Sequence, residues 1–155
     1  MEEDEVESLS LSFQPSLRRL PEYVTQMRSL RYLYLTKVGM TEFPDVYRLD
    51  RLVMLVLDYN QICVIPDDIC DMDSLKLLSL RHNRVEYFPT RVIRNLVTMY
   101  LDHNCIQEFP DFIYQMMPQF EYLSMTSNPM SYEVCHNMYS TFRQLQQCPS
   151  ATIKL

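Results

Sequence analysis

Apolar residues recur in this chain in one pattern, which repeats at steps of 22, 23, 21 and 24 residues. Each repeat has apolar residues at its first, fourth and sixth positions, and four of the five repeats have asparagine at the ninth. The repeats begin at Leu30, Leu52, Leu75, Leu96 and Phe120. The period of two between the fourth and sixth positions predicts a short strand in each repeat, with its apolar side chains facing a core.

The segment between one strand and the next is also regular. Each unit ends with an apolar residue followed by proline, at Leu20-Pro21, Phe43-Pro44, Ile65-Pro66, Phe88-Pro89 and Phe109-Pro110. After Pro21 the apolar residues are spaced by three, at Val24, Met27 and Leu30. This spacing predicts a 3₁₀ or irregular helical turn that lays one apolar stripe against the core.

The asparagines at the ninth position follow the predicted strands, and they are Asn60, Asn83, Asn104 and Asn128. A side-chain amide both donates and accepts hydrogen bonds, so it can satisfy backbone groups where a strand ladder ends. We therefore expect the four asparagines to stack as a ladder. Gln14 and Val38 take the corresponding places in the first two units. We expect the N-terminal end to be the looser one for this reason.

The repeated phrase LxxLxLxxN resembles the leucine-rich repeat, a unit of 20 to 29 residues. The resemblance covers nearly the whole chain. It implies an α/β solenoid with a curved parallel sheet on its concave face and short helical or irregular turns on its convex face. We expect a single leucine-rich repeat domain over residues 1–155, with an N-terminal cap and degraded first repeat at 1–29, central repeats at 30–128 and a C-terminal cap at 129–155.

The C-terminal segment resembles the cap of intracellular leucine-rich repeat proteins, in which a helix with tyrosine and arginine follows Asn-Pro and precedes a final proline and strand. The corresponding residues are Asn128-Pro129, Tyr139, Arg143 and Pro149. The five cysteines are an odd number without CxxC spacing, which indicates reduced thiols rather than a disulfide framework or a zinc site. The N-terminus lacks the positive and apolar regions of a signal peptide. We therefore expect a cytoplasmic protein.

Charge and composition argue against several classes of function. The chain has a net charge of −6 and a pI near 5.0, which opposes attraction to phosphate backbones, so we expect no nucleic-acid partner. No apolar run approaches the roughly 18 residues of a membrane span, so we expect no membrane partner. The single glycine, Gly39, leaves no phosphate-binding loop of the GxGxxG or GxxxxGK kind. We expect no cofactor.

Residues that flank the inward leucines form columns on the predicted concave face, with neighbouring strands about 4.8 Å apart. Two columns are rich in tyrosine and apolar residues, and two further columns carry charged residues and histidine. An exposed aromatic band bordered by charges is typical of a protein-binding surface. The alternative is that the tyrosines pair across strands and stabilise the sheet. The residues predicted to contact a partner protein are Tyr32, Tyr34, Met54, Val56, Asp58, Tyr59, Leu77, Arg81, His82, Tyr100, Asp102, His103 and Tyr122.

Two groups within this set have more specific interpretations. Asp58, Arg81 and Asp102 predict an alternating row of surface ion pairs, each worth about 0.2 to 1 kcal/mol. His82 and His103 lie on adjacent repeats with carboxylates one column away, which leaves a metal-dependent hydrolase as an alternative. We expect instead a monomeric, non-enzymatic scaffold or adaptor that binds a partner protein on its concave face. A regulatory inhibitor that covers the active site of an enzyme is the second alternative.

Overall fold

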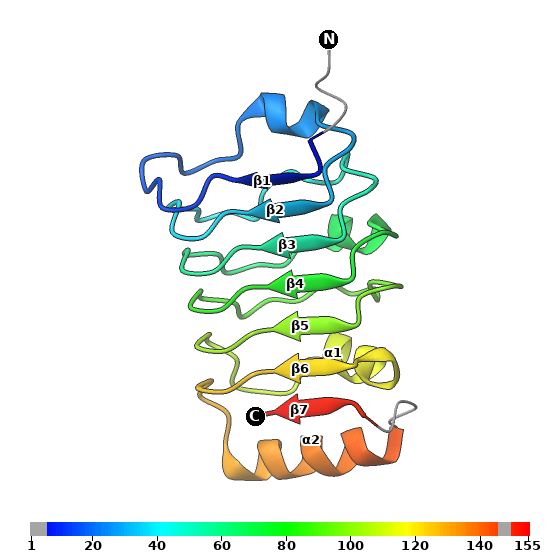
Figure 1. Cartoon of the computed structure of the whole chain (residues 1–155). Coiled ribbons are helices and arrows are strands. Elements are labelled where there is room, and N and C mark those ends of the chain that lie inside the picture. The colour runs from blue at the N-terminus through cyan, green and yellow to red at the C-terminus, as the bar shows by residue number, and fades with distance from the viewer. Residues whose placement is uncertain (1–5, 146–149) are drawn as a thin grey trace.

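The computed structural model describes residues 6–145 and 150–155, and it has an open sheet of seven parallel strands in chain order (Figure 1). The strands are β1 (Ser8–Ser10), β2 (Tyr32–Tyr34), β3 (Met54–Val56), β4 (Leu77–Ser79), β5 (Thr98–Tyr100), β6 (Tyr122–Ser124) and β7 (Thr152–Lys154). Each strand pairs with the next along the chain, because each repeat adds one strand and one return segment. This is the leucine-rich repeat solenoid that the sequence predicts.

The inward residues of the strands form one continuous core. The middle residue of β2, Leu33, pairs in register with Leu55 of β3, which pairs with Leu78 of β4, and all three are fully buried. The flanking residues of each strand face the other way and are mostly half-buried. The alternation read from the sequence therefore separates a core side from a solvent side over the length of the sheet.

The return segments carry short helices behind the sheet (Figure 1). They are η2 (Glu22–Gln26), η3 (Asp67–Asp71), α1 (Asp111–Met116) and η4 (Met117–Gln119). The proline at the end of a unit directly precedes η2, η3 and α1, which suits a residue with fixed φ and no N–H to donate. The predicted 3₁₀ turns are confirmed in η2 and η3, whereas the same position before β6 forms one α-helix followed by η4.

The C-terminal end is covered by α2 (Tyr132–Leu145) and β7. Helix α2 buries Met138 and Phe142 and lies across the end of the sheet (Figure 1). β7 then pairs with β6 through Ile153 opposite Leu123. The helix and final strand expected from the cap resemblance are thus present, while Pro149 lies outside the described residues. Within the described residues no helix combines the length and apolarity needed to cross a lipid bilayer.

The asparagine ladder is present and ties each repeat to the one before it. The Nδ2 of Asn83 donates to the carbonyl oxygens of Leu57 at 2.9 Å and Leu80 at 3.2 Å, and its Oδ1 accepts from the Ile62 N–H at 3.0 Å. The same pattern recurs at Asn60, Asn104 and Asn128. Because these amides are largely buried, the ladder holds the ends of the strands at fixed positions on the solvent side.

Candidate functional site

The solvent side of the sheet consists of the first and third residues of each strand and of the first and second positions after the inward apolar residue that follows the strand. We call this surface the strand face. It contains every residue predicted to contact a partner, and in the structure those residues lie side by side in four columns. Tyr59 and His103 are exposed, Asp102 is buried at 7% exposure, and the others are half-buried.

The tyrosines of the strand face pack on their neighbours. The rings of Tyr100 and Tyr122 have centroids 5.2 Å apart, and the Tyr34 hydroxyl donates to the Met54 sulfur at 3.5 Å. These contacts agree with cross-strand pairing, which stabilises the sheet. The same contacts fix the rings in place, so that the exposed parts of the tyrosines form a rigid surface rather than a set of free side chains.

The fourth column is a continuous stack, which we call the ring column, and it consists of Phe13, Lys37, Tyr59, His82 and His103. The Lys37 ammonium lies 5.7 Å from the Phe13 ring centroid and 4.9 Å from that of Tyr59. The Tyr59 and His82 rings stack at 4.1 Å, and so do those of His82 and His103. The prediction set included the last three of these residues and omitted Phe13 and Lys37, although all five share one register in the sequence.

Every residue of the ring column has positive φ, from 54° at His82 to 63° at Phe13, and Ser127 continues the register at 58°. This left-handed conformation costs a residue other than glycine about 1 to 2 kcal/mol. It turns the chain after the strand so that the next residue, such as Asn83, enters the ladder. The stack of rings is thus a consequence of the same turn repeated in each unit.

The predicted row of surface ion pairs is wrong for Asp58. Its Oδ1 accepts hydrogen bonds from the Ser79 hydroxyl at 2.6 Å and from the Arg81 N–H at 3.0 Å. The charged side chain of Arg81 turns instead to the following repeat, where its Nε donates to Oδ2 of Asp102 at 3.1 Å. Asp58 is therefore a backbone-capping residue, because the small Ser79 leaves room for its carboxylate above the strand.

Asp102, which follows β5, makes the same kind of contacts with the next repeat as Asp58, which follows β3. Its Oδ1 accepts from the Ser124 hydroxyl, from the Thr126 N–H at 3.0 Å and from the Thr126 hydroxyl at 2.6 Å. Burial raises the pKa of the Asp102 carboxyl, but hydrogen bonds from Ser124, Thr126 and Arg81 outweigh it, and the pKa lies below its ordinary value. Asp102 is ionised at neutral pH and positions Arg81, whose guanidinium lies 3.8 Å from the Tyr100 ring centroid.

The two histidines have a geometry that does not suit a shared metal ion. The His82 and His103 rings are parallel within 11°. The nitrogen lone pairs lie in the ring planes, so those of the two stacked rings lie in nearly parallel planes about 4.1 Å apart and do not converge on one ion. Burial and the neighbouring His103 lower the pKa of His82, against the opposite effect of Asp58 and Asp102. In residues 6–145 and 150–155 no three His, Cys, Asp or Glu side chains gather as a metal site.

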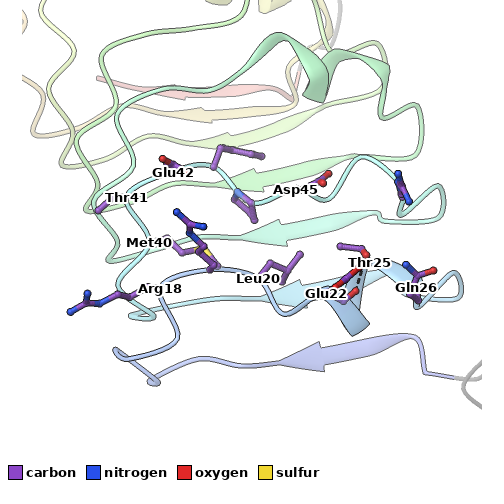
Figure 2. Close-up of a pocket in the computed structure, with 13 residues that line it drawn as sticks. Arg18, Leu20, Glu22, Thr25, Gln26, Met40, Thr41, Glu42 and Asp45 are labelled. Carbon is purple, nitrogen blue, oxygen red and sulfur yellow. Dashed lines mark hydrogen bonds between the residues drawn. The ribbon is translucent and has the colours of Figure 1, made fainter.

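A pocket of about 470 Å³ lies on the helical side near the N-terminus (Figure 2). It is lined by residues of segments 18–26 and 40–48, which include three carboxylates and three arginines. The Arg18 side chain points away from the other labelled side chains, and Thr25 donates to the carbonyl oxygen of Glu22 at 2.8 Å. The pocket shares no residue with the strand face, and its mixed charge favours no single class of ligand.

Comparison with known proteins gives relatives built from the same repeat. No family model matches the chain. Fibromodulin from Sus scrofa is 28% identical over 106 residues, covering 67% of this chain and 72% of the fibromodulin sequence. Lumican from Mus musculus is 26% identical over 106 residues, covering 67% of this chain and 31% of lumican. Leucine-rich repeat and IQ domain-containing protein 4 of Mus musculus is 33% identical over 86 residues, covering 54% of this chain and 14% of that protein.

Solved structures share the architecture. Internalin C2 of Listeria monocytogenes superposes with a TM-score of 0.73 at 22% identity, covering 97% of this chain and 62% of internalin C2. A leucine-rich repeat protein of Leptospira interrogans gives a TM-score of 0.64 at 21% identity, covering 97% of this chain and 49% of that protein. At this level of identity the likeness concerns the fold alone.

The relatives contradict the expected location of the protein. Fibromodulin, lumican and keratocan are secreted proteins of the extracellular matrix, so the prediction of a cytoplasmic protein is wrong. That prediction depended on the N-terminal sequence, on cysteine spacing and on the form of the C-terminal cap. The form of the cap describes how the solenoid is closed, here by α2 and β7, and does not by itself report the compartment.

Proposed function

The chain is a leucine-rich repeat protein, and from this premise we propose that it is a non-enzymatic module that binds a partner protein on its strand face. Proteins with this fold are typically protein-interaction modules. The module acts as a monomeric scaffold or adaptor. The alternative is a regulatory inhibitor, which would bind its target enzyme through the same strand face. The identity of the partner distinguishes the two roles.

One observation carries this proposal, and it is the fixed array of rings and cations on the strand face. Tyr59 is 46% exposed and Phe13 is 70% exposed, although both are large apolar side chains. Stacking, cation–ring contacts and the buried carboxylates hold the array in one arrangement. A surface that is already ordered loses little conformational entropy when a partner binds, so more of the contact energy appears as affinity.

The parallel stack of His82 and His103 argues against the metal-dependent hydrolase. A metal or an acid–base pair needs side-chain lone pairs that converge on one atom. The two histidine rings instead continue the column of Phe13, Lys37 and Tyr59. Phe13 has no donor atom and Lys37 is a cation, so neither offers a further metal ligand beside the histidines. The histidines therefore fit a contact surface better than they fit an active site.

The proposal is tested by capturing the partner and comparing variants by calorimetry. Tyr34→Ala and Tyr100→Ala should each weaken binding by at least about 2 kcal/mol, roughly thirtyfold, because central aromatic residues carry a large share of binding energy. Arg48→Ala on the helical side is the control and should leave affinity unchanged. Circular dichroism and denaturant titration show whether each variant is folded. Unchanged affinity in both folded tyrosine variants, with a loss in the Arg48 variant, contradicts the proposal.

A further inference from the structure

Cations at the carboxyl ends of the strands lie against aromatic rings. Lys37 lies between the rings of Phe13 and Tyr59, as described above. At the other end of the sheet the Lys154 ammonium lies 5.6 Å from the ring centroid of Tyr122. A ring face attracts a cation and limits its movement without neutralising its charge. These ammonium groups are therefore held on the strand face and remain available to an anion.

The carboxylates of the same region are already engaged. Asp58 and Asp102 accept hydrogen bonds from the next repeat, and Asp102 also pairs with Arg81. Across residues 6–145 and 150–155, neither Lys37 nor Lys154 has a carboxylate within ion-pair distance. Although the whole chain has a net charge of −6, Lys37, Arg81 and Lys154 outnumber Asp58 and Asp102 by three to two at this edge of the sheet, which leaves one net positive charge there.

Apart from Asp58 and Asp102, the acidic residues that adjoin the strands lie at their amino ends. Glu7 directly precedes β1 and Glu121 directly precedes β6, and both are exposed. Over the sheet as a whole, the charged residues next to the strands balance at the amino ends and sum to one positive charge at the carboxyl ends. On a chain with a net charge of −6, an acidic partner is therefore favoured at the carboxyl ends of the strands.

The ring column suits an extended chain. From Lys37 to His103 the column crosses three strand spacings, about 14 Å, which is the length of about four residues of extended peptide. The Lys37 ammonium and the edges of the histidine rings can donate hydrogen bonds along this path. A carboxylate at each end of such a segment would meet a donor, while apolar groups between them would lie beside Tyr59 and Tyr100.

We propose that the partner segment seated on the ring column is an extended, acidic stretch of protein whose carboxylates bind Lys37 and the His82–His103 pair. This inference rests on the proposed function and adds the chemistry of the partner to it. It assigns Lys37, a residue outside the set predicted from the sequence, as a determinant of specificity.

The experiment uses three labelled decapeptides of alternating composition, glutamate–tyrosine, glutamine–tyrosine and lysine–tyrosine, which differ only in charge. Fluorescence anisotropy measures their affinity for the whole chain at about 50 and about 500 mM salt, since salt screens exposed charges. The test variant is Lys37→Asn, because asparagine tolerates the positive φ of 56° at this position. The control is Arg94→Asn, which removes an exposed positive charge near Asp71 on the helical side.

The expected result is that the glutamate–tyrosine peptide binds more tightly than the other two, and that the difference shrinks at high salt. Lys37→Asn should weaken its binding about fivefold, whereas Arg94→Asn should leave it unchanged. The inference is overturned if the glutamate–tyrosine peptide does not bind, if the three peptides bind alike, or if the lysine–tyrosine peptide binds best. It is also overturned if Lys37→Asn has no effect.

A further variant separates this inference from the proposed function. If the peptides bind alike and Tyr34→Ala weakens all of them, the strand face binds protein without selecting charge, so that the inference fails and the proposed function stands. If the glutamate–tyrosine peptide loses affinity in Arg94→Asn and keeps it in both Tyr34→Ala and Lys37→Asn, binding lies on the helical side. Both proposals then fail.

Discussion

The central repeats and the N-terminal unit complete the same turn by different means. In the central repeats a buried asparagine amide bridges two turns, as Asn83 does. At the N-terminus Val38 fills that position with an apolar side chain, and the turn closes through Gly39 at a φ of 80° and through a hydrogen bond from the Arg18 N–H to the Val38 carbonyl oxygen at 2.9 Å. The Val38 turn supplies no ladder amide of its own, and its Val38 and Met40 N–H groups donate to Oδ1 of Asn60 in the next repeat at 3.2 and 3.0 Å.

The contrast shows which substitutions each region can accept. A ladder asparagine can be shortened without a clash, and the cost is then that of the unpaired backbone groups. Gly39 cannot be enlarged, because a Cβ there would lie 2.6 Å from the Pro15 carbonyl oxygen. The N-terminal unit is therefore sensitive to added volume, and the central repeats are sensitive to lost hydrogen bonds.

The largest effect is expected for Gly39→Ala. The new methyl group clashes with a backbone oxygen, and alanine is strained in the left-handed conformation. We therefore expect a loss of about 2 to 4 kcal/mol in unfolding free energy. Denaturant titration measures it, with Thr41→Ala, an exposed neighbour, as the control. A loss no greater than that of the control would show that the N-terminal turn moves aside, and the contrast between the two regions would disappear.

The next effect is expected for Asn83→Ala. Removing the amide leaves the Ile62 N–H without its side-chain partner and takes one of two amide donors from the Leu57 carbonyl oxygen, which should cost about 1 to 3 kcal/mol. Asn137→Ala in helix α2 lies outside the ladder and should be nearly neutral. Equal losses at the two positions by denaturant titration would contradict the role assigned to the ladder.

The core and the ladder could be predicted from the sequence because their signals are local and repeated. Leu33 and Asn83 are each recognised from spacing within one unit, and both lie where the pattern requires. The capping role of Asp58 could not be predicted, since it depends on Ser79, which lies in the next repeat and is unremarkable by itself. The predicted looseness of the N-terminal end stays a prediction, which amide exchange in β1 and β2 compared with β4 and β5 would test.

The conformation of the ring column was also beyond sequence reasoning. Positive φ is usually signalled by glycine or asparagine, whereas here it falls on tyrosine, histidine and lysine. The only available signal was position, since each such residue directly precedes the ninth place of its unit. Alternation and the repeated register placed the candidate contact residues on the solvent side of the sheet, whereas their mutual stacking required the turn geometry.

A smaller effect is expected from pH at the ring column. The pKa of His82 is lowered in the folded chain by burial and by His103, against Asp58 and Asp102, while Arg81 adds to the lowering. Near pH 6 the unfolded chain therefore binds more protons at this residue than the folded chain does. The stability that His82 contributes is complete above its unfolded pKa of about 6.5 and is lost as the pH falls toward the folded pKa.

This expectation is checked by denaturant titration of the parent chain and of His82→Asn between pH 7.5 and 5.5. Asparagine accepts the φ of 54° at this position and does not titrate, so the variant should lose less stability on acidification than the parent. His136→Asn in α2 is the control and should keep the slope of the parent. If the unfolding free energy of His82→Asn falls with pH as steeply as that of the parent, the stacked ring does not resist protonation.

The smallest effect is expected at Ser127, where the register of the ring column ends. Its φ of 58° places serine in a conformation that asparagine adopts more readily, and its side chain is exposed. Ser127→Asn should raise the unfolding free energy by about 0.5 kcal/mol, because the turn is retained and its strain is reduced. Ser10→Asn, in the extended backbone of β1, is the matched control and should stabilise nothing, since asparagine is disfavoured in strands. If Ser10→Asn raises the unfolding free energy as much as Ser127→Asn does, the left-handed turn carries no strain. The turns of the central repeats would then restrict the choice of residue no more than the strands that they follow.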